Sequence, residues 1–120
     1  MIVERFRDAK EYVAGDGTSL REVLRKHMSD SGAPFSIAHA YLGPGGESAP
    51  HRLKTSTEIY YVISGAGAMH VGDESSKLGE GDSVMIPPGK VQYITNMGGL
   101  ELEILCLVYP PWRAEDDENV

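Results

Sequence analysis

The chain has 120 residues, 41% of them hydrophobic and 24% charged, which suits one globular domain with a single core. Its formal net charge of −7 opposes binding to nucleic acid or to an anionic membrane surface, because those partners are themselves negative. One cysteine, a charged N-terminus and the lack of a long apolar run predict no internal disulfide, no signal peptide and no membrane span, so we expect a cytoplasmic protein.

The first 34 residues are predicted to form a strand and a short helix that pack on the domain that follows. Thr18–Leu24 fits a short helix, because Glu22 stands where its side chain could complete a capping box. At the other end of the chain, residues 113–120 form an acidic tail. Glu115–Glu118 are four consecutive acidic residues, so we predict that this tail is solvated.

The stretch 35–112 carries short apolar runs separated by Gly, Pro and Asp, about ten residues apart, which indicates strands joined by turns. This spacing leaves no room for crossover helices and predicts an all-β sandwich or barrel. The predicted strands are Phe35–Leu42, Ile59–Ile63, Ala66–Val71, Ser83–Ile86, Val91–Ile94 and Leu100–Tyr109.

Two segments carry a recognisable spacing of fixed residues. From Gly45 to Gly65 the sequence is GGESAPHRLKTSTEIYYVISG, which resembles the first cupin motif except that Leu53 replaces its second histidine. From Gly81 to Asn96 it is GDSVMIPPGKVQYITN, which resembles the second cupin motif with Gln92 in place of its histidine. Both motifs in order identify a small single-domain cupin. The resemblance implies a cupin-type antiparallel β-sandwich barrel, or jelly roll, over residues 35–112.

The family's site is a divalent metal held inside the barrel by three histidines and one glutamate. Residues two apart on a strand share a face, so the resemblance places His51 and Glu58 inside, with Gln92 beside them. These three residues are the predicted metal ligands, and an amide oxygen is a poor substitute for imidazole. The resemblance therefore implies at most one weakly held Zn, Fe, Mn or Ni ion. The alternative is a metal-free pocket in which the three side chains hydrogen-bond to one another.

The walls of the pocket follow from strand alternation. Glu101 and Glu103 should face water, which turns the alternate residues of the last strand inward. His39 shares a strand face with Ile37 and Tyr41, and we expect it to enter the barrel beside the site. The predicted pocket residues are Leu53, Tyr60, Ile104, Cys106 and His39.

Two functions are compatible with this pocket, and both involve a small-molecule ligand. The first is an enzyme on a small polar metabolite, of dioxygenase, isomerase or lyase type. It would use a weakly held metal, or it would use Glu58 as general base with His51 as its acid partner. The second is a non-catalytic module that binds a small, sugar-like molecule without a metal. The family resemblance further implies a homodimer, to which Met1–Val13 would contribute a strand.

Overall fold

The computed structural model describes residues 1–120 as a chain of short strands with little helix. In chain order the elements are η1 (Phe6–Asp8), β1 (Glu11–Val13), β2 (Ser19–Glu22), α1 (Arg25–Ser31), β3 (Ser36–Leu42), β4 (His51–Leu53), β5 (Thr57–Ser64), β6 (Gly67–Val71), β7 (Glu74–Leu78), β8 (Ser83–Ile86), β9 (Gln92–Asn96), β10 (Leu102–Tyr109), η2 (Ala114–Asp116) and β11 (Asp117–Asn119). No helix has both the length and the apolar character needed to cross a membrane.

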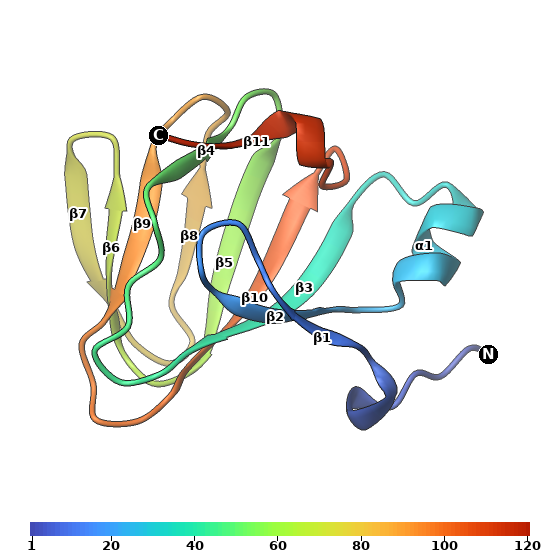
Figure 1. Ribbon diagram of the computed structural model, residues 1–120, viewed down its shortest axis with the longest axis horizontal. Coiled ribbons are helices and arrows are strands. Elements are labelled where there is room, and N and C mark those ends of the chain that lie inside the picture. Colours follow the sequence, from blue (N-terminus) through green and yellow to red (C-terminus); the bar gives the residue numbers. More distant parts are fainter.

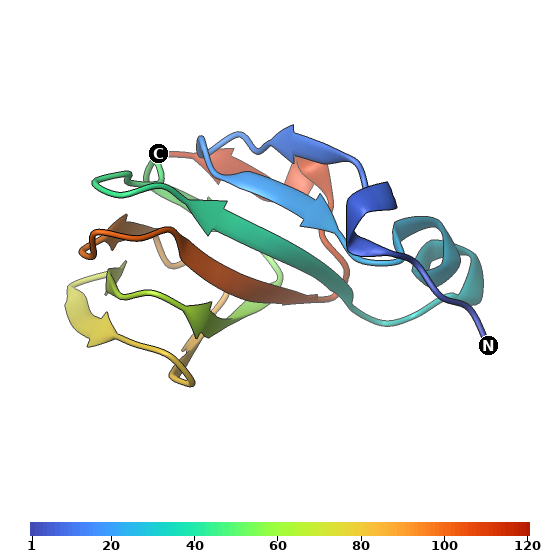
Figure 2. The ribbon, with the colours of Figure 1, turned by 90° about the horizontal axis from the view of Figure 1, so that it is seen from below.

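The strands form two sheets that pack face to face (Figures 1 and 2). One sheet has six strands in the order β1-β2-β3-β10-β5-β8, and the other has five in the order β11-β4-β9-β6-β7. All strand pairs are antiparallel. The helix α1 and the N-terminus extend from one end of this sandwich, far from β6 and β7 (Figures 1 and 2). The predicted all-β antiparallel sandwich is confirmed.

The core lies between the sheets and follows the period-2 alternation of the strands. On β10 the buried residues are Leu102, Ile104, Cys106 and Val108, as the sequence predicted for this strand. Side chains from the facing strands complete this core, among them Val62, Met69, Ile86 and Ile94.

The fixed residues of both motifs shape turns. Gly65 has a φ of 90°, and a Cβ at this position would lie 2.8 Å from the carbonyl oxygen of Glu101, so only glycine fits. Asn96 is buried, and its Nδ2 donates hydrogen bonds to the carbonyl oxygens of Leu42 and Leu100 at 2.9 Å each. These contacts hold together the loops at one end of the sandwich.

The helix expected at Thr18–Leu24 is wrong, because Ser19–Glu22 is strand β2. This strand is hydrogen-bonded on both sides, to β1 and to β3, and pairing on two edges outweighs a local capping pattern. Glu22 accepts a hydrogen bond from the Tyr12 hydroxyl at 2.7 Å instead of capping a helix. The helix of the structure, α1, begins three residues after β2.

The acidic tail is not solvated as predicted. Asp116 is buried, and its carboxylate accepts hydrogen bonds from the backbone N–H and hydroxyl of Thr55 and from the backbone N–H of Ser56, at 2.6 to 3.1 Å. Burial alone would raise the pKa of Asp116, but these hydrogen bonds outweigh it and lower the pKa. The residues after it form β11, which pairs with β4 and so belongs to the smaller sheet.

Candidate functional site

A cavity of about 280 Å³ lies between the two sheets, and its wall is mostly apolar. Strands β3, β5 and β10 form one side, and β4, β9 and β11 contribute to the other. Six residues predicted for the site line this cavity together, namely His51, Leu53, Glu58, Tyr60, Ile104 and Cys106. Their functional roles stay predictions.

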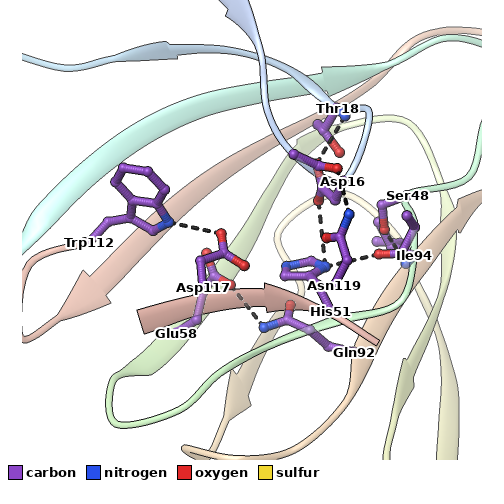
Figure 3. A network of polar contacts seen from close by, with 12 residues as sticks. Asp16, Thr18, Ser48, His51, Glu58, Gln92, Ile94, Trp112, Asp117 and Asn119 are labelled. Atoms are coloured by element: carbon purple, nitrogen blue, oxygen red, sulfur yellow. Dashed lines mark hydrogen bonds and ion pairs between the residues drawn. The ribbon is translucent and has the colours of Figure 1, made fainter. Parts of the chain in front are cut away.

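Gln92 joins the two motifs at this site. It lies directly opposite His51 in the pairing of β9 with β4, and only 1% of it is exposed. Its Nε2 donates a hydrogen bond to Glu58 Oε1 at 3.0 Å (Figure 3). The hydrogen bond between Gln92 and Glu58 that the metal-free alternative required is therefore present.

Glu58 is a buried carboxyl without a cationic partner. Burial raises its pKa, the Gln92 hydrogen bond opposes this shift, and the nearby Asp117 and Asp16 carboxylates add to it, so that the pKa is about 8. At neutral pH the Glu58 side chain is therefore mainly the neutral acid, which can donate a proton or a hydrogen bond.

His51 is held in one orientation by the backbone. Its Nδ1 lies 3.0 Å from the carbonyl oxygen of Ala49, and because a carbonyl only accepts, Nδ1 carries the proton. In the neutral ring this leaves the electron pair on Nε2. The same Nδ1 lies 3.7 Å from Asp16 Oδ2, so His51 is positioned by Ala49 and Asp16 and not by Glu58 or Gln92.

His39 does not enter the cavity, contrary to the prediction. It lies on the outer face of β3, where its ring contacts those of Phe6 and Tyr41 at 5.2 and 5.9 Å between centroids. The residues of β3 that turn inward are the small ones, Ala38 and Ala40, together with Leu42. Small side chains on this wall leave space for the cavity, whereas His39 on the other face contacts Phe6 of the N-terminal segment.

Two carboxylates of the site were not predicted, Asp16 and Asp117. Asp16 lies in the turn between β1 and β2, which lies over the cavity and is held by hydrogen bonds from Ala49 N to Asp16 O at 2.7 Å and from Asn119 Nδ2 to Gly15 O at 3.0 Å. Asp117 is the first residue of β11 and accepts a hydrogen bond from Trp112 Nε1 at 2.9 Å. In the sequence both residues have the pattern of a surface turn or tail, and only the pairing of the chain ends with the barrel brings them to the site.

Tyr60 and Cys106 belong to the cavity wall, and both are almost fully buried. Burial is the first cause that raises the pKa of each side chain well above its ordinary value, and the negative charge of Glu58 adds to this. Cys106 is therefore held as the thiol, which is a weak nucleophile and a small apolar wall residue.

The donors present do not fit the metal that the cupin resemblance implies. No cluster of three or more His, Cys, Asp or Glu side chains has an arrangement that could hold a metal ion. Leu53 is 4% exposed and apolar where a ligand would stand, and Gln92 presents its amide N–H group, not its oxygen, to Glu58.

Comparisons with known proteins agree with the architecture. Over 118 residues the chain is 36% identical to the uncharacterised protein MJ1618 of Methanocaldococcus jannaschii, covering 98% of this chain and 94% of that protein. It is 25% identical over 112 residues to an oxalate-binding protein of Thermotoga maritima, covering 90% and 93%. The crystal structure of a predicted oxalate decarboxylase from Thermotoga maritima superposes with a TM-score of 0.78 and 22% identity, covering 91% of this chain and 99% of that one, which shows a common fold. The cupin domain model matches residues 38–108, and the chain therefore belongs to the cupin family.

Proposed function

We propose that the cavity binds a small organic molecule and catalyses proton transfer to and from that molecule, with Glu58 as the acid and His51 Nε2 as the base. The observation that supports this most is the pairing of Glu58 with the amide of Gln92, in the wall of a mostly apolar cavity that His51 also lines. An amide donor in place of a histidine holds the Glu58 carboxyl without ligating a metal. These roles reverse those expected from the sequence.

The reaction class that matches this pair is an isomerisation or an elimination. In an isomerisation, His51 Nε2 removes a proton from a carbon next to a carbonyl group, and protonated Glu58 donates its proton to the carbonyl oxygen, which gives a neutral enol. In an α-hydroxy ketone, His51 then returns its proton to the former carbonyl carbon, and the hydroxyl group on the carbon that was first deprotonated gives its proton to Glu58. This moves the carbonyl group by one carbon and restores both side chains. A carboxyl that is mainly protonated at neutral pH and an imidazole with an unprotonated Nε2, in one mostly apolar cavity, support this class.

Deuterium exchange tests the proposal. The protein is incubated in D₂O with small ketones that carry hydroxyl or amino substituents, and loss of the carbon-bound proton signal is followed by NMR. We expect Glu58→Gln and His51→Gln each to slow the exchange by about 100-fold or more. Matched controls are Glu103→Gln and His39→Gln on the outer face of the barrel, which should leave the rate unchanged. Equal rates in all four variants and the wild type would refute the acid–base roles.

The second function is a binding module without chemistry. The apolar wall that Leu53, Ile104 and Cys106 provide favours it, since such a wall binds a ligand without any proton transfer. In that case titration detects binding of a ligand, but none of the ketones exchanges its carbon-bound protons for deuterium. A weakly held divalent metal on His51, Glu58 and Gln92 stays a prediction of the family resemblance. The cytoplasmic location stays a prediction from the sequence.

A second copy of this chain is the proposed partner. The outer face of the six-stranded sheet exposes an apolar patch on β5, β8 and β10, made of Tyr61, Ile63, Met85, Leu105 and Tyr109. Tyr61 and Leu105 lie opposite each other in the pairing of β5 with β10, so the patch is continuous across the strands. Exposed patches of this kind mark association surfaces. The residues Met1–Val13, which the resemblance implicated in dimerisation, contribute β1 to the chain's own sheet beside β2.

A further inference from the structure

The charged residues that line the cavity are all acidic. Carboxyl groups reach it from Asp16, Glu22, Glu58 and Asp117, and neither a lysine nor an arginine lines it. His51 is the one lining residue that can become a cation. A ligand that enters this cavity therefore meets carboxyl groups without the basic side chains that recognise carboxylate or phosphate.

Two of these carboxylates have no basic side chain of Lys or Arg to neutralise them. Glu22 is paired with Arg25, whose Nε lies 3.0 Å from its Oε2, so its charge is balanced. Asp117 accepts a hydrogen bond from Trp112 Nε1, which is neutral. Asp16 accepts one from the backbone N–H of Thr18 at 3.0 Å and lies 3.7 Å from His51 Nδ1. Figure 3 shows Asp16, Asp117 and Glu58 gathered around His51.

A polar side chain in the same wall also has no hydrogen-bond partner in the protein. Tyr60 is 6% exposed and lines the cavity, and its hydroxyl forms no hydrogen bond within the protein. Because this hydroxyl has no partner in the protein, it is available to a bound molecule that carries N–H or O–H donors. The phenolic oxygen accepts a hydrogen bond, as the two aspartates do. The cavity therefore offers acceptors and negative charge, between walls that are otherwise apolar.

We propose that the ligand of this cavity is a small organic cation, a primary or secondary ammonium group attached to an apolar body. The ammonium group is placed by Asp16 and Asp117, and the body lies against the apolar walls. Carboxylates and phosphates are excluded by the same charges, although a relative of this chain is an oxalate-binding protein. This inference rests on the proposed function in one respect, that the same cavity is the binding site.

Three compounds of nearly equal size test the charge preference. Benzylamine is a cation near neutral pH, benzyl alcohol is neutral and benzoate is an anion, and all three carry one phenyl ring. We expect the wild type, titrated by calorimetry or NMR shifts, to bind benzylamine about tenfold tighter than benzyl alcohol and to bind benzoate more weakly still. The proposal would be overturned if benzoate bound as tightly as benzylamine, or if benzylamine showed no binding at about 10 mM.

Variants that remove the charges of Asp16 and Asp117, singly and together, test whether these two residues cause the preference for a cation. Asp16→Asn and Asp117→Asn keep the hydrogen-bond acceptors for Thr18 N and Trp112 Nε1 while they remove the negative charge. The preference for benzylamine over benzyl alcohol should fall to about twofold or less when both are combined. The control is Glu118→Gln, which makes the same charge change next to Asp117 but on a residue paired with Arg52 and outside the cavity wall.

The outcomes separate this inference from the proposed function. A preference that survives in the double variant contradicts the inference, whatever the deuterium exchange shows. A preference that the double variant abolishes, in a protein that exchanges no ketone proton, supports the inference and contradicts the acid–base roles of Glu58 and His51. The ranking of the three compounds on the wild type needs no variant to fold.

Discussion

Replacing Glu58 with glutamine should make the protein more stable at alkaline pH. The buried carboxyl has a pKa raised from 4.5 to about 8, first of all by burial. A raised pKa in the folded state means that the folded chain binds the proton more tightly than the unfolded chain does. The stabilisation is fully present below about pH 4.5, declines as the pH rises and is lost above about pH 8.

The size of this effect follows from the pKa change. A difference of about 3.5 pH units, at 1.36 kcal/mol for each, corresponds to an upper limit of about 5 kcal/mol in the free energy of unfolding. Glutamine is nearly isosteric, its amide oxygen can accept the Gln92 hydrogen bond, and it stays neutral at every pH. Glu58→Gln should therefore match the wild type near pH 5 and exceed it by several kcal/mol near pH 9.

Urea denaturation at intervals between pH 5 and pH 9 measures this difference directly. The control is Glu101→Gln, an exposed carboxyl just before β10, which should shift the whole curve little. A wild-type stability that does not decline between pH 5 and pH 8, or a Glu58→Gln variant no more stable than the wild type at pH 9, would refute the argument that Glu58 is protonated in the fold.

Three further predictions concern the anchor of the C-terminus, the metal and the association surface. Asp116→Ala leaves buried donors of the β4–β5 turn without acceptors, so urea denaturation should show a loss of about 3 kcal/mol, whereas Asp116→Asn should lose less. The double variant Leu53→His, Gln92→His should bind Zn²⁺ or Ni²⁺ at least about 100-fold tighter than the wild type in calorimetry, because imidazole is a far better ligand than leucine or an amide. No gain in affinity would show that the pocket geometry does not suit a metal. Tyr61→Glu should give monomers by light scattering with the barrel still folded, and an unchanged mass would exclude the β5–β10 face as the association surface.

The strands with an apolar alternation were predictable, because a half-buried strand repeats its pattern every two residues. On β10 the alternation alone identified the four buried residues, and the motif spacing placed His51 and Glu58 in one cavity. Strand β7 carries no such signal, since four of its five residues are exposed and only its pairing with β6 makes it a strand. Strands β1 and β11 are three residues each and lie at sheet edges, so too few positions exist to show a period.

The errors at the site have two physical origins. We expected the larger side chains of β3 to point inward, as they do in a filled core, but a cavity needs small residues on its wall. Ala38 and Ala40 face inward, and His39 packs against Phe6 outside. Asp16 and Asp117 were missed because they reach the site through contacts between segments more than 30 residues apart, such as Asn119 with Gly15, which no local pattern encodes.

The two departures from the cupin motif make chemical sense together. A site of three imidazoles and one carboxylate needs a cation at its centre, and this chain has one imidazole with several carboxyls and no arrangement that could hold a metal. Gln92 supplies the Glu58 carboxyl with a neutral donor, and Leu53 continues the apolar wall. The remaining charges of Asp16 and Asp117 still favour a positive partner, and an ammonium group with an apolar body satisfies both the charges and the walls. In our proposal, this barrel accepts an organic cation at the place where the family motif holds an inorganic one.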